Sequence, residues 1–347
     1  MKQRTTIGIT MGDPAGVGPE ILVKALATLR RSEAVRSFDL VVIGDRAIVE
    51  HEVLKQKTDL RLGSLDDGQI TDAQVVDLGV TRAQPIQPGA ISGEAGRLSY
   101  AAIERGVELA IAKRIDALVT CPVSKEAINL AGIPFVGHTE TIAKMTGTSG
   151  TVMMLAHGNV RVTHLSTHVP LSMVPSLLTP QRLRRVLDLT INALHDLGIT
   201  RPRIAVAALN PHAGENGLFG TEDGEISAKV IAEYVRAPAE VTGPHPADTI
   251  FVKAVAGYFD AIVAMYHDQG HIPLKLLGFK IDPTTKKWVG LSGINVTLGL
   301  PIIRTSVDHG TAFDIAGRGI ANAQSLLEAV GYARDMAAHQ RKTAGVP

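Results

Sequence analysis

Short runs of β-branched and aliphatic residues alternate with longer amphipathic segments along most of this chain, and this alternation restricts its fold more than any other feature. The runs with the length and composition of strands cover residues 6–11, 40–44, 75–78, 117–121, 152–156, 160–165, 204–209 and 261–265. Apolar residues at helical spacing occupy segments 93–113, 180–197 and 222–236. Strands joined through helices form βαβ units, so we expect an α/β fold built on mostly parallel sheets.

The length of the chain suits two such lobes. Domains usually contain about 100–200 residues, and this chain has 347. No internal repeat or Pro/Gly-rich linker divides it, so we expect strands that cross between the lobes to join them. A cleft between lobes is a common place for a ligand, and we expect the active site there.

Composition excludes several classes of protein. Lysine and arginine total 35 against 34 for aspartate and glutamate, so no global field attracts nucleic acid or a membrane surface. No signal-peptide block opens the chain, and no apolar run approaches the roughly 18 residues of a membrane span. The single cysteine, Cys121, ends an apolar strand and is expected to be a buried, unreactive side chain rather than a nucleophile. We therefore expect a soluble cytoplasmic protein.

The segment HDQGHIPLKLLGF, residues 267–279, combines an imidazole, a carboxylate and an ammonium. It follows the expected strand 261–265, which places His267 and Asp268 at the carboxyl end of that strand. Ligands bind at this end of the strands in open α/β sheets. Lys275 comes about two helical turns after His267, so it can project from the same face.

Three histidines, His168, His212 and His267, each lie just beyond an expected strand. A single histidine in such a place is more often a hydrogen-bonded loop residue than a ligand. Three at equivalent strand ends predict a shared divalent-metal site, because neutral imidazoles favour zinc and its neighbours. Asp248 and Asp268 are candidate general bases or orienting carboxylates, with helix capping as the alternative.

A second set of polar residues suits an anion. Its members are His138, Thr139, Lys275, Asn295 and Arg304. Arg304 ends the apolar stretch 298–303, where a guanidinium is unusual unless it binds an anion or a buried acid. A structural salt bridge is the alternative for Arg304.

Two glycine-rich segments could hold phosphates or adenosine. Segment 12–20 follows the first strand, but Ile21 occupies the place of the third glycine of the dinucleotide fingerprint, and no P-loop lysine follows. We therefore reject both nucleotide motifs there, and Asp45 as a ribose-binding acid is a weak match. Segment 308–322 offers many backbone donors and suits an adenosine or pyrophosphate loop, although glycine turns alone could explain it.

Together these motifs closely resemble those of the 4-hydroxythreonine-4-phosphate dehydrogenase family, over essentially the whole chain. The matching pieces are TMGDPAGVGPE at 10–20, GHTE at 137–140, NPHAG at 210–214, PADT at 246–249, AMYHDQG at 264–270 and RTSVDHGTA at 304–312. The resemblance implies the two-lobed fold of isopropylmalate dehydrogenases, with residues 1–136 and 306–347 in one lobe. Residues 137–305 would form a second lobe that carries the metal ligands and the contacts of a homodimer.

The resemblance also implies roles for individual residues. His168, His212 and His267 match the metal ligands, one of them contributed across the dimer, and zinc is expected before magnesium, manganese or cobalt. The matching substrate contacts are His138, Thr139, Lys275, Asn295 and Arg304, and the cofactor loop is represented by His309, Gly310, Thr311, Ala312 and Asn322. Lys275, Asp248 and Asp268 are the candidate catalytic residues.

The implied reaction is oxidation of a four-carbon 3-hydroxy acid 4-phosphate at C3, followed by loss of the carboxylate. NAD is the expected oxidant, with NADP as the alternative. The divalent metal would make the C3 alcohol more acidic and stabilise the enolate. Lys275 and Arg304 would hold the carboxylate or phosphate.

Substrate identity is less closely specified. Segments 214–220 and 271–278 look more like the branch that oxidises D-threonate or D-erythronate 4-phosphate than the vitamin B6 branch. A dehydrogenase of an aromatic cis-dihydrodiol carboxylate such as terephthalate dihydrodiol is one alternative, and a catalytically inactive metal- or phosphate-binding relative is another. Segment 280–292, which contains the only tryptophan, Trp288, departs from the family pattern and is either a surface excursion or a lid.

Overall fold

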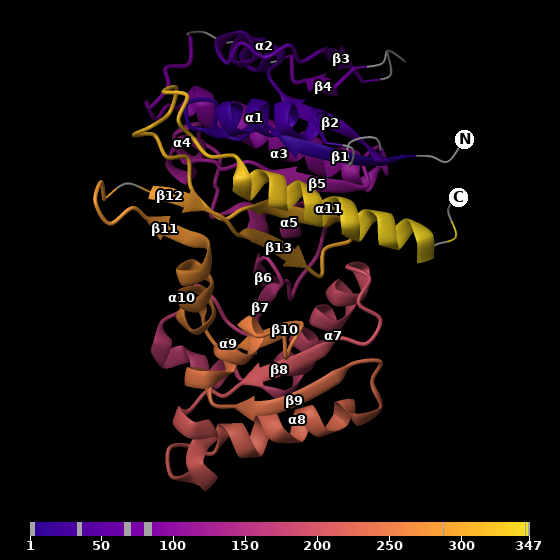
Figure 1. Ribbon diagram of the computed structural model, residues 1–347, viewed down its shortest axis with the longest axis vertical. Helices are drawn as coiled ribbons and strands as arrows, with labels where there is room; N and C mark the ends of the chain where they lie inside the picture. The colour runs from indigo at the N-terminus through magenta and orange to yellow at the C-terminus, as the bar shows by residue number, and fades with distance from the viewer. Residues whose placement is uncertain are drawn as a thin grey trace. The chain divides into compact units, whose positions relative to one another are not determined.

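Two compact units make up the chain in a computed structural model that describes residues 4–32, 37–65, 71–79, 85–286, 288–343 and 345 (Figure 1). Unit 1 contains residues 1–149 and 300–347, and unit 2 contains residues 150–299. Both are α/β units with mostly parallel strands, so the expected fold class is confirmed. No helix in the described ranges is long and apolar enough to cross a membrane.

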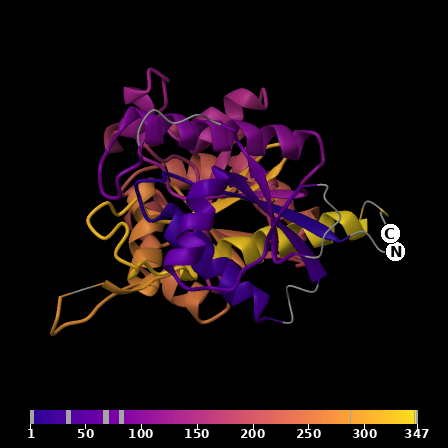
Figure 2. The same cartoon turned by 90° about the horizontal axis from the view of Figure 1, so that it is seen from above.

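Unit 1 is built on parallel strands in the order β3-β4-β2-β1-β5-β14. The strands are β1 (Thr5–Thr10), β2 (Phe38–Gly44), β3 (Leu62–Ser64), β4 (Ala73–Asp77), β5 (Ala117–Thr120) and β14 (Ile303–Val307). The helices are α1 (Gly18–Arg30), α2 (Arg46–Lys55), α3 (Gly93–Ile111), α4 (Lys125–Leu130), α5 (His138–Met145) and α11 (Gln324–Thr343). Side chains alternate between the two faces of these buried strands, and both faces are covered by helices (Figure 2).

The alternation decides which residues of β5 and β14 share a face. Leu118 joins an apolar cluster with Ile103 of α3 and Ile142 of α5. Thr305 of β14 is aligned with Val119, the residue after Leu118. Its hydroxyl donates a hydrogen bond to the carbonyl of Ala329 in α11. Arg304 is aligned with Leu118, so its side chain lies on the face covered by α3 and α5.

Unit 2 has a mixed sheet with the strand order β13-β6-β7-β10-β8-β9. Strands β7 (Val160–His164), β10 (Ala261–Ala264), β8 (Arg203–Ala207) and β9 (Glu240–His245) are parallel, whereas β6 (Val152–His157) is antiparallel to both β7 and β13 (Ile294–Leu298). A separate antiparallel hairpin contains β11 (Phe279–Ile281) and β12 (Trp288–Leu291). The core includes Leu155, Val162, Ala205, Ile250 and Ile262.

The helices of unit 2 are α6 (Val174–Leu177), α7 (Pro180–Asp196), α8 (Ala228–Glu233), α9 (Ala247–Val255) and α10 (His267–Gly278). Short 3-10 turns cover Leu171–Met173, Pro211–Gly217 and Tyr234–Arg236, and one π-helical turn covers Asp223–Ser227. The helix expected over 222–236 is therefore present as one continuous helical run, with a π turn near its start and a 3-10 turn at its end. Asp223 is fully buried and accepts hydrogen bonds from the backbone N–H groups of Leu209 and Asn210, at 2.8 and 2.9 Å, and the wide π turn begins at this residue.

The division between the units differs from the expected boundaries. It falls after Ser149 and after Gly299, instead of after residues 136 and 305. Helix α5 belongs to unit 1 because Ile142 packs into the core of that unit, and β14 belongs there because it pairs with β5. His138, Thr139 and Arg304 therefore lie in unit 1, whereas His168, His212 and His267 lie in unit 2.

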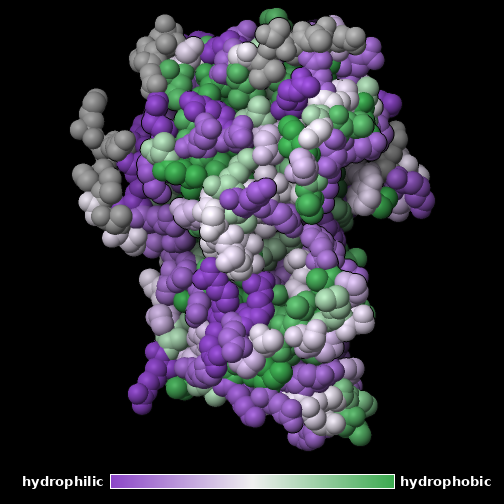
Figure 3. Space-filling model, turned by 180° about the vertical axis from the view of Figure 1, so that it is seen from behind, coloured by the Kyte–Doolittle hydropathy of each residue, from purple (hydrophilic) through white to green (hydrophobic). Residues whose placement is uncertain are grey.

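Cys121 and Asp45 occupy ordinary structural positions in unit 1. Cys121 is buried, and burial raises the pKa of its thiol, as expected for an inert side chain. Asp45 caps α2 by accepting a 3.0 Å hydrogen bond from the N–H of Ile48, which is an ordinary capping role. On the face shown in Figure 3, hydrophobic residues are exposed among hydrophilic ones.

Candidate functional site

A buried guanidinium lies at the carboxyl end of β5 in unit 1. Arg304 is only 3% exposed, and one of its terminal nitrogens donates a 2.6 Å hydrogen bond to the hydroxyl of Thr120. Burial lowers the pKa of Arg304 to about 10, although the nearby carboxylate of Glu140 acts in the opposite direction. The guanidinium remains charged at neutral pH, so it is a strong fixed donor for an anion.

His138 begins α5 beside this guanidinium. Its Nε2 atom is buried and has no hydrogen-bond partner in the described part of the chain. Burial, followed by the positive charges of Arg304 and Lys125, holds the pKa of His138 well below its usual value. A neutral imidazole with an unsatisfied buried nitrogen is suited to a polar ligand. Thr139 is the next residue of α5, so the structure brings these three predicted substrate contacts into one unit.

A cluster of histidines lies at the carboxyl ends of β7 and β10 in unit 2. The ring centroids of His168 and His267 are 5.7 Å apart, so two of the three predicted metal ligands are neighbours. The Nδ1 atom of His267 lies 2.7 Å from a carboxylate oxygen of Asp268. When Nδ1 donates this bond, Nε2 is the nitrogen available to a metal, which is the usual role of a carboxylate behind a ligating histidine.

Two histidines that the sequence interpretation missed support this cluster. His271 stacks on His267 with 3.6 Å between ring centroids, and its Nδ1 lies 2.9 Å from the carbonyl oxygen of His267. The His164 ring is 4.8 Å from that of His271 and is fully buried, and burial lowers its pKa to about 3. The spacing of four residues between His267 and His271 could have revealed the first of these contacts, because such residues share a helix face.

The third predicted ligand, His212, lies elsewhere in unit 2. It belongs to a turn after β8 in which residues 212–216 all have positive φ. Among the described residues, no group of three or more His, Cys, Asp or Glu side chains is gathered for a metal. A single chain therefore offers His168 and His267 together, and His212 apart from them.

The other predicted catalytic and binding residues of unit 2 lie on α9, α10 and β13. Lys275 is on α10, with its ammonium 4.1 Å above the ring of Phe279. The side-chain oxygen of Asn295 on β13 is buried and has no hydrogen-bond partner in the described ranges. Asp248 is exposed in the first turn of α9, where a carboxylate interacts favourably with the helix dipole.

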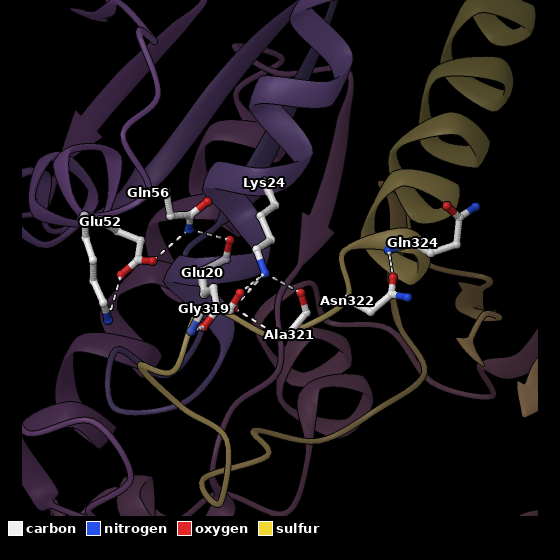
Figure 4. A network of polar contacts seen from close by, with 9 residues as sticks. Glu20, Lys24, Glu52, Gln56, Gly319, Ala321, Asn322 and Gln324 are labelled. Atoms are coloured by element: carbon white, nitrogen blue, oxygen red, sulfur yellow. Dashed lines mark hydrogen bonds and ion pairs between the residues drawn. The ribbon is translucent and has the colours of Figure 1, made fainter. Parts of the chain in front are cut away.

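The predicted cofactor loop is tied to the start of α1 (Figure 4). The carboxylate of Glu20 accepts hydrogen bonds from the N–H groups of Gly319 and Ala321, at 3.1 and 2.7 Å, while Lys24 donates to the carbonyl oxygens of the same two residues. The carbonyl of Thr311 accepts a 2.9 Å bond from the N–H of Val17. These contacts hold the loop next to the glycine-rich segment 12–20.

Two details of this loop bear on cofactor binding. Asn322 accepts a 2.7 Å bond from the N–H of Gln324 and thereby caps the start of α11, which is a structural role that a ligand could share. A cavity of about 370 Å³ adjoins the loop at Gly317, and its other walls include Gly16, Glu20, His51, Lys55 and Pro88. This volume lies within the range of small-molecule sites.

The segment expected to depart from the family pattern, 280–292, forms most of the β11–β12 hairpin. The rings of Phe279 and Trp288 meet edge to face at 5.8 Å, and Trp288 is 59% exposed. The hairpin connects the helix that carries Lys275 to the strand that carries Asn295. This connection makes it part of the surroundings of two predicted substrate contacts.

Comparison with known sequences identifies the family. A sequence profile of the family described as pyridoxal phosphate biosynthetic protein PdxA matches residues 36–333. The chain belongs to the PdxA family. A relative from Bradyrhizobium diazoefficiens, named as a candidate D-threonate 4-phosphate dehydrogenase, is 56% identical over 96% of each chain. This agrees with the resemblance expected from the motifs.

Solved structures related to this PdxA-family chain agree with it in fold. A 4-hydroxythreonine-4-phosphate dehydrogenase from Klebsiella pneumoniae is 40% identical, with a TM-score of 0.80 over 96% of this chain and 99% of that one. A terephthalate 1,2-cis-dihydrodiol dehydrogenase from Burkholderia xenovorans is 30% identical, with a TM-score of 0.69 over 96% of this chain and 98% of the other. These relatives are named dehydrogenases, which bears out the expectation of an oxidoreductase.

Proposed function

We propose that this PdxA-family chain catalyses the NAD-dependent, metal-assisted oxidation and decarboxylation of a four-carbon 3-hydroxy acid 4-phosphate. The observation that carries the proposal is the buried Arg304 guanidinium close enough to His138 to lower its pKa, together with a buried Nε2 of His138 that has no hydrogen-bond partner among the described residues. Both groups are suited to an anionic substrate. We place D-threonate or D-erythronate 4-phosphate before 4-hydroxythreonine 4-phosphate. The name of the 56% identical relative supports that order.

The proposed reaction has two parts. A hydride passes from C3 of the substrate to the nicotinamide, and the proton of the C3 hydroxyl passes to a base on the protein. The resulting 3-keto acid loses carbon dioxide when the C1–C2 bond breaks, because the C3 carbonyl accepts the electron pair as an enolate. C2 is then protonated, so the net change is one hydride transferred and one carboxylate lost.

Residues of both units would serve this reaction. In unit 1, Arg304, His138 and Thr139 would bind the substrate, and the loop with His309, Gly310, Thr311, Ala312 and Asn322 would bind NAD, with NADP as the alternative cofactor. In unit 2, Lys275 and Asn295 are the other proposed substrate contacts. Lys275, Asp248 and Asp268 are the candidates for proton transfer, and the 2.7 Å contact with His267 suits Asp268 better to orienting that ring.

The histidines of unit 2 fit a divalent metal shared between two copies of the chain. His168 and His267 would come from one copy and His212 from a second copy, because only the first two are neighbours within one chain. A divalent metal, zinc before magnesium, manganese or cobalt, would supply Lewis acidity at the C3 oxygen. Large apolar side chains exposed on unit 2 also favour a homodimer: Leu171, Met173, Val252, Val255, Ile272 and Leu276.

The deciding experiment is NADH formation by the purified, metal-supplemented protein. D-threonate 4-phosphate, D-erythronate 4-phosphate and 4-hydroxythreonine 4-phosphate would be assayed in parallel, with terephthalate dihydrodiol as a fourth substrate. We expect turnover of at least one phosphate and a clear preference among the three. Activity on none of the four, despite metal and phosphate binding, would point instead to an inactive relative.

The dihydrodiol is a second candidate substrate because a dehydrogenase named for it is 30% identical to this chain. Activity on the dihydrodiol alone would replace the proposed substrate class. The anion site of unit 1 would then bind the carboxylate of an aromatic acid instead of a phosphate.

A further inference from the structure

Lys125 lies beside the His138–Arg304 pair, and none of the roles assigned above includes it. It is the first residue of α4 and comes five residues after Thr120, where β5 ends. Its Cε atom is 3.9 Å from the place where a Cβ on Gly137 would stand, so the side chain runs past the start of α5. Within the described ranges, its exposed ammonium makes no hydrogen bond or ion pair.

Positive charge in this place exceeds negative charge. The guanidinium of Arg304 and the ammonium of Lys125 both act on His138 and both lower its pKa after burial does. The carboxylate that acts on Arg304 is that of Glu140. Two cations and a neutral imidazole with one carboxylate form a cluster that an added anion would stabilise.

The donors are more numerous than a carboxylate needs. Arg304 presents a planar fork, Lys125 a point charge and His138 a ring nitrogen, and α5 adds the backbone N–H groups of its first turn. The N-cap residue of α5 is Gly137, which has no side chain to accept from these N–H groups, and the Glu140 carboxylate lies 2.7 Å from the place of a Cβ on Gly137. A phosphate monoester has three terminal oxygens and close to two negative charges at neutral pH, so it can occupy more of these donors than a carboxylate can.

We propose that Lys125 is a further phosphate-binding residue of this chain, and that Thr120 is a positioning residue that holds the Arg304 guanidinium for the same phosphate. The inference rests on the proposed function, because it takes that phosphate to belong to the substrate. Thr120 is fully buried, and its 2.6 Å hydrogen bond fixes one arm of the guanidinium. Arg304 itself is buried, so this hydrogen bond contributes to the direction in which the guanidinium points.

The first test is calorimetric titration of inorganic phosphate into the full-length protein. Lys125→Met should weaken phosphate binding at least tenfold, while Lys125→Arg should stay within about threefold of wild type because the charge is retained. Lys144→Met is the matched control, since it removes an exposed lysine from the last turn of α5, the helix that begins at His138. Unchanged affinity in Lys125→Met, or acetate binding as tightly as phosphate, would overturn the assignment.

The second test separates positioning from simple packing at position 120. Thr120→Val keeps the shape but removes the hydroxyl, and Thr120→Ser keeps the hydroxyl but removes a methyl group. We expect the valine variant to lose phosphate affinity and the serine variant to recover it, with the KM for NAD unchanged in both. Equal affinities in the two variants would refute the positioning role, and far-UV circular dichroism would verify that both fold.

These outcomes can be distinguished from failure of the proposed function. Phosphate binding that depends on Lys125, without turnover of any phosphorylated acid, would support the inference and refute the proposed reaction. Turnover of a phosphorylated acid with a KM that Lys125→Met leaves unchanged would support the proposed reaction and refute the inference. A wild-type protein that binds no phosphate would contradict the inference directly.

Discussion

The backbone of Gly270 lies against the imidazole of His164. A Cβ atom at position 270 would overlap with the Nε2 atom of His164 and would lie only 2.8 Å from a methyl group of Val162. His164 is fully buried on β7 and cannot move into solvent without leaving the core. The first turn of α10, which begins at His267, can therefore approach β7 only because residue 270 has no side chain.

We expect Gly270→Ala to reduce the free energy of unfolding by about 1–3 kcal/mol, since overpacking of a close contact costs about that much. Chemical denaturation monitored by circular dichroism measures the change. Gly224→Ala is the control, because a Cβ there would meet no atom within 4 Å. Equal stability of the two variants would show that α10 moves away from His164 without cost.

The free energy of unfolding should also decrease as the pH is lowered, because of His164. Its folded-state pKa is lowered to about 3, so between that value and its ordinary 6.5 only the unfolded chain binds the proton. Acidification in this window therefore favours unfolding, by about 1.4 kcal/mol per pH unit for one histidine. The lowered pKa of His138 adds a slope of the same sign.

His164→Asn should remove the contribution of His164 to this dependence of the free energy of unfolding on pH. Denaturation curves between pH 6.5 and 4.5, recorded with a chelator so that metal binding does not contribute, make the comparison with wild type. A slope that the substitution leaves unaltered would mean that His164 is already protonated in the folded protein.

Arg304→Lys should raise the KM of the phosphorylated acid at least tenfold, about 1.4 kcal/mol of binding free energy. Lysine keeps the charge but cannot donate to Thr120 and to an anion through a rigid fork. Steady-state kinetics at saturating NAD provide the measurement. A KM within twofold of wild type would favour a purely structural role for this arginine.

Metal ligation across two copies of the chain can be tested by complementation. His168→Ala and His212→Ala should each abolish turnover and lower metal content when purified alone. Mixing and refolding the two variants should restore about a quarter of wild-type activity, because about half the dimers are mixed and each has one intact site. If all three histidines of one chain bound one metal, no mixed dimer would recover activity.

Deletion of residues 281–288 should change the KM or the preference among the three phosphorylated acids by threefold or more. The deletion removes most of the β11–β12 hairpin but leaves Phe279, on whose ring the Lys275 ammonium rests. Trp288→Ala tests the exposed ring alone. Kinetic constants that stay the same in both proteins would make the hairpin a surface excursion.

The sequence predicted much of the fold because hydrophobic patterning is local. Strands 152–156 and 160–165 and helix 180–197 were expected within a residue or two of their observed bounds. The helix expected over 222–236 is present, but its first turn widens into a π turn at Asp223. Asp223 bonds to backbone groups on another segment, and no local pattern reports such a contact. The division after Ser149 instead of after residue 136 has a similar cause, since Ile142 packs into a core assembled from distant strands.

Prediction of the candidate site had the same limit. Residue type and position after a strand were enough to single out His267 and Arg304. They could not show that Thr120 fixes Arg304, because the two residues are 184 positions apart in sequence and meet only through strand register. His164 also went unnoticed, since a buried histidine at the end of a strand has no sequence signal that separates it from any other polar strand residue.

The pairing of β5 with β14 has a consequence for how the protein is made. Residues 150–299 form a compact unit that is continuous in sequence, so this unit can fold during translation, before synthesis of the chain is complete. The neighbouring unit must wait for β14 and α11, which come from the last part of the chain. Arg304 reaches Thr120 only when that late strand adds to β5, so the surroundings of this guanidinium are among the last features of the newly synthesised protein to form.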